Sequence, residues 1–349
     1  MTGKLIFKNE LIFEGVNFGA RVSKAGEIVF STGMTGYPES LTDPSYKGQI
    51  LVLTYPLVGN YGIPDKAFWE SEKIQVSGLI VSCYIDTPYH FESRQTLGSW
   101  LKSENVPALE IKDTRLLTQL IRDHGTMLGK IVNGKNIDYY DPDQENQVEK
   151  VSTKKVLFQI RYKNAKNIML IDCGAKRNIE RALLKRGVNV ITVPWDFDLT
   201  NNDLNTKIDA VIISNGPGDP EKADKAILNI RKLMGTNIPI LGICLGNQLL
   251  ALAAGGKTKK LKYGHRSQNQ PCILEGTKRC FITTQNHGFE ISKVPIGFKP
   301  WFTNANDGSN EGIIHKKKLI MSVQFHPEAT PGPHDAEWIF DYFLEKVKN

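Results

Sequence analysis

The sequence lacks the features that mark exported, membrane-spanning or repetitive proteins. Its 349 residues contain no apolar run near the roughly 20 residues that a membrane span needs. The opening stretch, MTGKLIFKNELIFEG, lacks the long apolar core of a signal peptide. The five cysteines are widely spaced and odd in number, which does not suggest a disulfide framework. We therefore expect a cytoplasmic protein with reduced cysteines and no contact with a membrane.

The composition is that of an ordinary globular protein, with 40% hydrophobic and 23% charged residues and a formal net charge of +7. The densest basic stretch is KTKKLKYGHR, at residues 257–266. It could line a nucleic-acid groove, but no nucleic-acid-binding motif accompanies it, so we expect a solvated surface and no nucleic-acid partner.

The C-terminal half alternates strand and helix signals. Apolar strands are predicted at NIMLID, VNVITVPW, KIDAVIIS and IPILGI, with helices at RNIERALLKRG, EKADKAILNIRKLMG and GNQLLALAAGG. This alternation predicts an α/β fold with a doubly wound, mostly parallel sheet and flanking helices. Short strands are expected after Gly264 at RCFITT, GFEIS, EGIIH and KLIMSVQF, and a last helix at 335–347.

The N-terminal half is richer in strand and turn signals, with helices predicted at LGSWLKSEN and TRLLTQLIRDHG. The polar stretch 133–155 has almost no periodic pattern of apolar residues, and we expect the boundary between two domains there. We predict two domains, a smaller β-rich α/β domain at 1–150 and the parallel-sheet domain at 151–349.

The stretch LGICLGNQLL, residues 241–250, places Cys244 between two glycines after a buried strand. Such a cysteine is either a small core hydrophobe or a nucleophile that a strand-to-helix turn lifts out of the sheet and exposes. At a helix N-terminus the macrodipole would favour its thiolate. Ligands of doubly wound sheets bind beyond the carboxyl ends of the strands, where Cys244 and the NGPGDP loop are predicted to lie.

A nucleophilic cysteine needs an acid/base partner, and QFHPEATPGP offers His326 and Glu328 directly after an apolar strand. In extended backbone, residues two apart face the same side, so the carboxylate could orient the imidazole. By itself H-x-E is weak, because a surface His beside a surface Glu is common. Its significance comes from the combination with the cysteine turn.

GICLGNQLL together with FHPE resembles the class I glutamine amidotransferases, in which a Cys-His-Glu triad hydrolyses glutamine. The stretch STGMTGYPESLTDPSYKGQILVLTYPLVGNYG, with IDCGAKRNI, SNGPGDP and QNHGF, narrows the resemblance to the small, glutaminase subunit of carbamoyl-phosphate synthase. The resemblance covers essentially the whole chain and includes the N-terminal half, which other triad amidotransferases lack.

The resemblance implies Cys244 as nucleophile, His326 as acid/base and Glu328 as the residue that orients it. It implies a glutamine site made of Ser45, Gly216, Gly218, Leu245, Gln248, Asn286, Gly288 and Phe289. From the residues alone, Ser45 would be a turn residue after Pro44, whereas the N–H of Leu245 suits an oxyanion donor, with that of Gly216 as a second candidate. The other four cysteines, Cys83, Cys173, Cys272 and Cys280, are expected to be structural.

One position departs from the family pattern, because Asn247 stands where the family usually has histidine. Asn at this position resembles the branch that uses free ammonia, but that branch lacks the cysteine. Because Cys244, Leu245 and Gln248 are present, we predict an active glutaminase.

The resemblance implies that ammonia from glutamine passes to a synthetase subunit or domain, which makes carbamoyl phosphate from bicarbonate and ATP. The sequence has no P-loop, because NGPGDP lacks the G-K-[ST] ending. We therefore expect no metal or cofactor in this chain, with ATP, Mg²⁺ and bicarbonate on the partner. The N-terminal half is the candidate for docking that partner. Two alternatives remain: a catalytically silent docking subunit, and another triad amidotransferase or a γ-glutamyl hydrolase.

Overall fold

The computed structural model describes residues 2–198 and 204–347. The chain separates into two compact units, Met1–Glu145 and Asn146–Asn349, and the division falls within the polar stretch 133–155. Each unit has its own sheet and its own apolar clusters.

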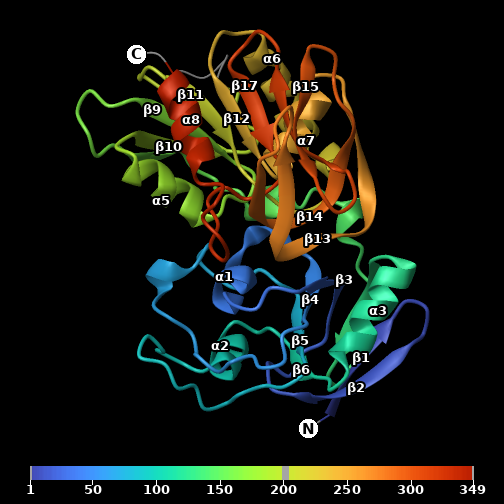
Figure 1. Ribbon diagram of the computed structural model, residues 1–349. Helices are drawn as coiled ribbons and strands as arrows, with labels where there is room; N and C mark the ends of the chain where they lie inside the picture. The colour runs from blue at the N-terminus through green and yellow to red at the C-terminus, as the bar shows by residue number, and fades with distance from the viewer. Residues whose placement is uncertain (1, 199–203, 348–349) are drawn as a thin grey trace. The chain divides into compact units, whose positions relative to one another are not determined.

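A ten-stranded mixed sheet forms the second unit (Figure 1), in the order β14-β13-β15-β16-β17-β12-β11-β9-β10-β8. The parallel strands are β17 (Ile320–Val323), β12 (Ile240–Ile243), β11 (Ala210–Ile213), β9 (Asn167–Asp172) and β10 (Asn189–Pro194). The antiparallel strands are β8 (Leu157–Gln159), β16 (Asn310–His315), β15 (Phe298–Asn304), β13 (Lys257–Leu274) and β14 (Cys280–Lys293). The predicted α/β sheet is confirmed, with its parallel part at the centre and antiparallel strands on both sides.

Helices cover both faces of this sheet, and the alternation of side chains along each strand explains why. Ile168 and Leu170 of β9 belong to the apolar cluster of α5 (Arg177–Lys185) and α8 (Trp338–Lys346). Met169 and Ile171 belong to the cluster of α6 (Asp224–Met234) and α7 (Leu245–Ala253). Strands buried on both faces are apolar throughout, which is the pattern that the sequence showed. The short elements are α4 (Val148–Val151) and η4 (Pro220–Lys222).

The first unit contains a seven-stranded mixed sheet that closes on itself as a barrel, in the order β1-β2-β6-β5-β4-β3-β7. Its strands are β1 (Thr2–Phe7), β2 (Ile12–Asn17), β3 (Lys24–Ser31), β4 (Gln49–Leu53), β5 (Gly78–Val81), β6 (Ala108–Glu110) and β7 (Met127–Val132). Its helices are α1 (Tyr37–Thr42), α2 (Leu97–Ser103), α3 (Thr114–His124), η1 (Pro44–Tyr46), η2 (Lys66–Phe68) and η3 (Pro142–Gln144). The two longer helices lie where the sequence predicted them, and they pack on different apolar clusters, α2 through Trp100 and α3 through Leu117.

The C-terminal hairpin differs from the sequence prediction. RCFITT and GFEIS, expected as separate short strands, form the single strand β14, which pairs with a still longer β13 that begins before Gly264. Gly264 has φ +71° and lies in a register shift between Lys260 and His265, so the glycine produces a bulge rather than a strand end. The strand β15 was not predicted.

Within the described residues, every helix is too short or too polar to cross a membrane.

Candidate active site

Cys244 lies at the turn between β12 and α7, where its backbone has φ 53° and ψ −103°. This conformation is strained for a residue with a side chain. The turn packs tightly on the end of β11. Gly246 N–H donates to Ser214 O at 3.0 Å, and a Cβ at Gly246 would lie 2.2 Å from Ile213 O. Because only glycine fits at this position, the packing fixes the elbow that carries the sulfur.

The Cys244 side chain is only 2% exposed, so the exposure expected of an elbow cysteine is not observed. Strand β14 passes over the turn, and the Cys244 thiol donates to Asn286 O at 3.7 Å. The structure thereby places Asn286, a predicted glutamine-site residue, directly beside the predicted nucleophile.

His326 and Glu328 lie in a turn that follows β17, rather than in extended backbone. Ala329 N–H donates to His326 O at 3.1 Å, which closes the turn. His326 Nδ1 lies 2.6 Å from Glu328 Oε1, and the two side chains are 1% and 0% exposed. The other ring nitrogen, Nε2, has no well-formed hydrogen bond to any residue that the structure describes. It is therefore available to exchange a proton with a reacting group.

The charges of these residues favour an ionised pair. Burial lowers the pKa of His326, but the Glu328 carboxylate and the neighbouring Cys244 thiol outweigh burial and raise this pKa to about 10. Burial raises the pKa of Glu328, but the Lys176 ammonium and the His326 ring outweigh it and lower this pKa to about 2. His326 is thus an imidazolium at neutral pH, and its positive charge lies beside Cys244.

Lys176 contacts the candidate site, and the sequence analysis did not identify it. Its Nζ lies 3.3 Å from Glu328 Oε1 and also donates to Ala329 O, and its side chain is 2% exposed. The neighbouring Asn178 donates through Nδ2 to Glu328 O at 2.5 Å and to Thr330 Oγ1 at 2.7 Å. The start of α5 therefore holds the turn that carries His326 and Glu328. The available signal was a lysine in IDCGAKRNI, directly after a buried parallel strand.

The loop NGPGDP lies against the elbow. A Cβ at Gly216 would meet Cys173 O at 2.1 Å and Leu245 Cδ2 at 2.8 Å, so the loop backbone approaches α7 as closely as glycine allows. The first N–H groups of a helix have no acceptor within the helix. The N–H of Gly246 donates to Ser214 O, and the N–H of Asn247 donates to Cys244 O. The N–H of Leu245 has no acceptor among the described residues. Leu245 N–H is therefore the best-placed donor for an oxyanion on a substrate bound to Cys244.

Gln248 connects α7 to β14. Its Nε2 donates to Phe289 O at 2.8 Å and to Gln324 Oε1 at 3.1 Å. Gly288 precedes Phe289 in β14. A Cβ at Gly288 would meet only the Arg266 guanidinium, at 3.2 Å. Of the predicted glutamine-site residues, the structure thus gathers Leu245, Gln248 and the β14 segment around Cys244.

Two predicted glutamine-site residues make contacts elsewhere. Gly218 has φ +82° and lies against Gln147, within 3.0 Å of its Cγ if a Cβ were added. Ser45 belongs to the first unit, where it is 7% exposed and its N–H donates to Asp43 Oδ1 at 2.9 Å in the turn η1. The roles of both residues in binding glutamine stay predictions.

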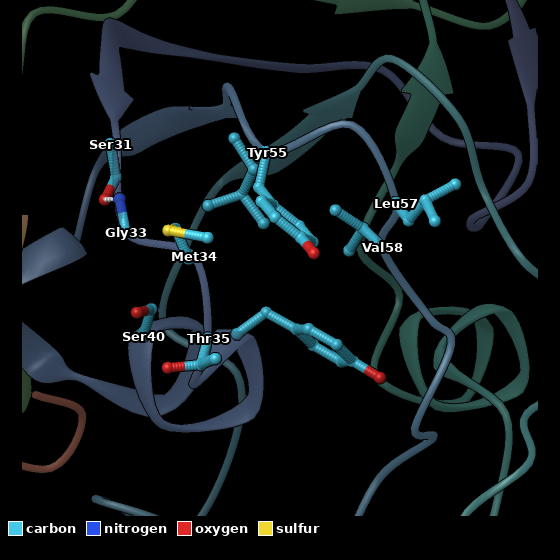
Figure 2. A pocket seen from close by; sticks show the side chains of 10 residues that line it. Ser31, Gly33, Met34, Thr35, Ser40, Tyr55, Leu57 and Val58 are labelled. Carbon is cyan, nitrogen blue, oxygen red and sulfur yellow. Dashed lines mark hydrogen bonds between the residues drawn. The ribbon is translucent and has the colours of Figure 1, made fainter.

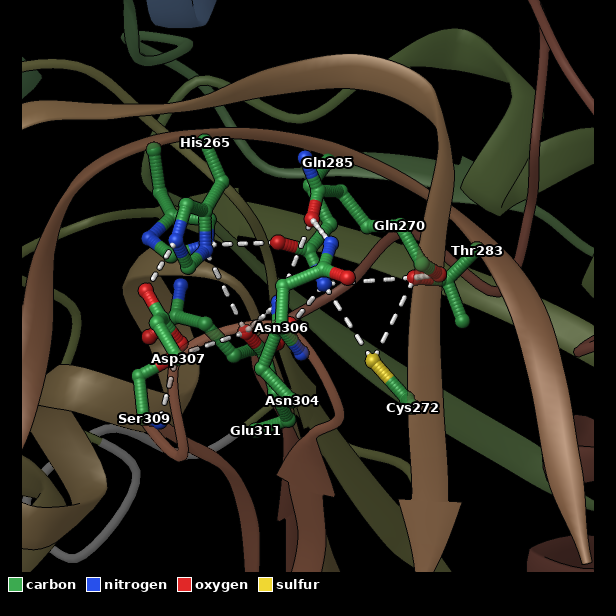
Figure 3. Close-up of polar contacts among 12 residues, drawn as sticks. His265, Gln270, Cys272, Thr283, Gln285, Asn304, Asn306, Asp307, Ser309 and Glu311 are labelled. Atoms are coloured by element: carbon green, nitrogen blue, oxygen red, sulfur yellow. Dashed lines mark hydrogen bonds and ion pairs between the residues drawn. The ribbon is translucent and has the colours of Figure 1, made fainter.

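A mostly buried cluster of polar side chains joins β14 to its neighbours in the sheet (Figure 3). Gln285 Nε2 donates to Glu311 Oε2 at 2.9 Å, and Gln285 Oε1 lies 3.1 Å from His287 Nε2. His287 Nδ1 lies 2.8 Å from Phe289 O, and burial lowers the pKa of this histidine. His265 Nε2 lies 2.8 Å from Asp307 Oδ2, and its Nδ1 lies 3.4 Å from Glu311 Oε1.

Ligand atoms of His265, His287 and Glu311 lie within 4.8 Å of one another, which is the kind of spacing that a metal ion can use. Most of these atoms already contact one another or a neighbouring amide or carbonyl, so we interpret the cluster as the hydrogen-bonded support of β14.

In the first unit, a pocket lies between the two ends of the long N-terminal motif (Figure 2). Its lining consists of Ser31, Gly33, Met34, Thr35, Tyr37, Ser40, Leu53, Tyr55, Leu57 and Val58. Met34 and Leu57 are 65% and 44% exposed. The lining side chains are hydroxyl-bearing or apolar, and none is charged.

Among the described residues, the other four cysteines have no acid/base partner comparable to that of Cys244. Cys173 and Cys272 are buried, and burial raises the pKa of both thiols, which keeps them protonated. Cys280 is exposed, and Cys83 is half-buried.

Comparison with known proteins agrees with this arrangement. Residues 169–346 match the family described as "Glutamine amidotransferase class-I", and residues 5–131 match "Carbamoyl-phosphate synthase small chain, CPSase domain". The chain is 46% identical to the carbamoyl phosphate synthase arginine-specific small chain of Neurospora crassa, over 97% of this chain and 78% of that protein.

Two longer relatives match the chain over a small part of their length. Identity is 49% with the multifunctional protein CAD of Squalus acanthias, over 97% of this chain and 16% of that protein. It is 44% with the human mitochondrial carbamoyl-phosphate synthase [ammonia], over 99% of this chain and 24% of that protein. The chain therefore belongs to the class I glutamine amidotransferases and, within them, to the small-chain family of carbamoyl-phosphate synthase.

Proposed function

We propose that the chain is the glutaminase component of glutamine-hydrolysing carbamoyl-phosphate synthase. The observation that carries this proposal is the buried triad, in which Glu328 holds Nδ1 of His326 at 2.6 Å while Nε2 stays available next to Cys244. An orienting carboxylate, a histidine and a cysteine at a helix N-terminus together supply acyl transfer through a thioester.

The reaction proceeds in two steps on these residues. The Cys244 thiolate attacks the side-chain amide carbon of glutamine, and the Leu245 N–H stabilises the oxyanion that forms. His326, an imidazolium in the resting pair, gives its proton to the departing ammonia. The neutral His326 then takes a proton from water, the resulting hydroxide attacks the glutamyl thioester, and glutamate leaves as the thiolate is restored.

The family and the sequence support the proposed partner and its substrates. Carbamoyl phosphate synthesis needs ATP and bicarbonate, and this chain carries no P-loop. We therefore assign ATP, Mg²⁺ and bicarbonate to a synthetase subunit or domain that receives the ammonia, and no cofactor to this chain. The exposed Met34 and Leu57 at the pocket of the first unit are the residues we favour for contact with that partner.

The direct test is release of glutamate and ammonia from glutamine by the purified chain, alone and with a synthetase of the same family. Glutamine-dependent carbamoyl phosphate formation by the pair supports the proposal. Hydrolysis of folate γ-glutamyl peptides in place of glutamine would favour a γ-glutamyl hydrolase. A pair that makes carbamoyl phosphate only from added ammonia would identify a catalytically silent docking subunit.

A further inference from the structure

Asn247 is fully buried, at 0% exposed, and lies in the first turn of α7 between the nucleophile and Gln248. Both ends of its side-chain amide are used. Its Oδ1 accepts from Ser322 Oγ at 2.7 Å, and its Nδ2 donates to Gln324 Oε1 at 3.0 Å. A buried amide with both ends satisfied has one orientation, because the reversed amide would place like groups together.

The contact to Gln324 continues into the glutamine site. Gln324 Oε1 accepts a second hydrogen bond, from Gln248 Nε2 at 3.1 Å, and Gln248 Nε2 also reaches Phe289 O at 2.8 Å. Gln324 Nε2 is buried and has no partner among the described residues. The orientation of the Gln324 amide is therefore set by the donors on its oxygen side, of which Asn247 is one.

We propose that Asn247 is a positioning residue for glutamine binding, acting through Gln324 on Gln248. This inference rests on the proposed function. Asn247 orients the Gln324 carbonyl, that carbonyl and Phe289 O together fix the Gln248 amide, and the Gln248 amide shapes the binding site. Without Asn247, the Gln324 carbonyl loses one of its two donors, and if the amide rotates, Gln248 loses one of its two acceptors.

This role differs from structural packing in what it changes. Among the described residues, the Asn247 side chain hydrogen-bonds to Ser322 and Gln324 and not to the nucleophile or its base, so its loss affects the affinity for glutamine before it affects the chemical step. A buried hydrogen bond that is broken costs on the order of a tenfold change in an equilibrium constant. We therefore expect a rise in KM with kcat nearly unchanged, whereas general loosening of α7 would lower kcat by displacing Cys244.

The test compares Asn247→Ala, Asn247→His, Gln324→Leu and the double variant Asn247→Ala/Gln324→Leu. Neutral histidine can donate to Gln324 and accept from Ser322, so Asn247→His should keep KM within about threefold of wild type, while Asn247→Ala raises it roughly tenfold. Because Asn247 acts through Gln324, the double variant should have the KM of Gln324→Leu alone. Asn189→Ala is the matched control, because Asn189 is also buried, at 3% exposed, but lies at the opposite ends of the strands.

Binding is measured separately by titrating glutamine into the same variants in a Cys244→Ser background. An Asn247→Ala variant that lowers kcat as much as it raises KM would overturn the proposal, as would additive effects in the double variant or an unchanged affinity. A wild-type chain that releases no glutamate from glutamine would instead contradict the proposed function, so the two failures are distinguishable.

Discussion

Lys176 and Glu328 form an ion pair that is almost completely withdrawn from water, with Nζ 3.3 Å from Oε1 and side chains 2% and 0% exposed. Glu328 Oε1 is the same oxygen that faces His326 Nδ1 at 2.6 Å. A buried carboxylate between an ammonium and an imidazole stays ionised, and it can therefore orient the base throughout turnover.

Replacing Lys176 with methionine should weaken this arrangement without touching the reacting atoms. Without the Lys176 ammonium, burial raises the pKa of Glu328. The turn also loses the hydrogen bond that Lys176 donates to Ala329 O. We expect kcat to fall by up to about a hundredfold, the cost of misplacing a catalytic group by about 1 Å. The measurement is kcat as a function of pH, in which the acidic limb should move to higher pH.

Lys166→Met is the matched control for that variant, because Lys166 Nζ also donates to a backbone carbonyl, Leu344 O at 3.0 Å, in the same unit. Identical losses of activity in the two lysine variants would show that Lys176 matters only for stability.

The nucleophile is tested by Cys244→Ser, which should abolish glutamine hydrolysis while glutamine binding persists. Removing the nucleophile of a triad lowers kcat by roughly a million-fold, so residual turnover above about a hundredth of wild type would contradict the assignment. Alkylation provides a second measurement. Because Cys244 is 2% exposed and Cys280 is exposed, labelling should be followed in a Cys280→Ser variant, where glutamine should protect the remaining fast thiol.

The roles of His326 and Glu328 differ, and so should their variants. His326→Asn removes the proton carrier, whereas Glu328→Gln removes only the group that orients it, so kcat should be roughly tenfold or more lower in the first. The same segment offers a matched control in His334 and Glu337, whose Nδ1 and Oε1 lie 2.5 Å apart but whose side chains are 69% and 31% exposed. His334→Asn and Glu337→Gln should leave kcat within about twofold, since exposed ion pairs contribute little. Equal values of kcat in all four variants would contradict the assignment of His326 and Glu328 to the triad.

The pKa of His326 also predicts how stability changes with pH. The folded-state pKa is raised to about 10, above the roughly 6.5 of an unfolded histidine. The stabilisation is therefore complete below about pH 6.5 and is lost as the pH rises toward 10, because the folded state binds the proton that the unfolded state has released. Urea denaturation between pH 6 and 10 should show this decline in wild type, and a flatter profile in His326→Asn. A wild-type profile as flat as that of the variant would contradict the ionised pair.

The sequence predicted the centre of the second unit well because the signals there are local. Strands buried on both faces are continuously apolar, and each is followed by a helix with its own period, as in β9 and α5. Cys244 was recognisable for the same reason, because its flanking glycines report a tight strand-to-helix turn. The barrel closure of the first unit was not predictable, because β1 pairs with β7 across more than a hundred residues, and no local pattern specifies that pairing.

The contacts that complete the site are also non-local. Lys176 meets Glu328, and Gln248 meets Phe289, through the order of the strands in the sheet rather than through spacing in the sequence. The turn at His326 was misjudged because β17 ends at Val323, three residues before the histidine. Hydrophobic period indicates where a strand runs, but it does not indicate the conformation of the residues beyond its end.

The last prediction concerns coupling to the synthetase. Ser45, which the family resemblance assigns to the glutamine site, belongs to the first unit, whereas the triad belongs to the second. Any response to ATP has to arrive through a partner, because the chain has no P-loop. We expect glutamate release to be slow for the chain alone and to rise roughly tenfold or more with synthetase, ATP and bicarbonate, which corresponds to a coupling free energy of about 1.4 kcal/mol or larger. The measurement compares the chain alone, the complex, and the complex with both substrates.

Ser45→Ala should weaken glutamine binding in all three conditions. Ser23→Ala serves as its control, because it removes a hydroxyl that donates to Lys135 O in the same unit. Equal rates in the three conditions, from a complex shown to be assembled, would favour a stand-alone hydrolase.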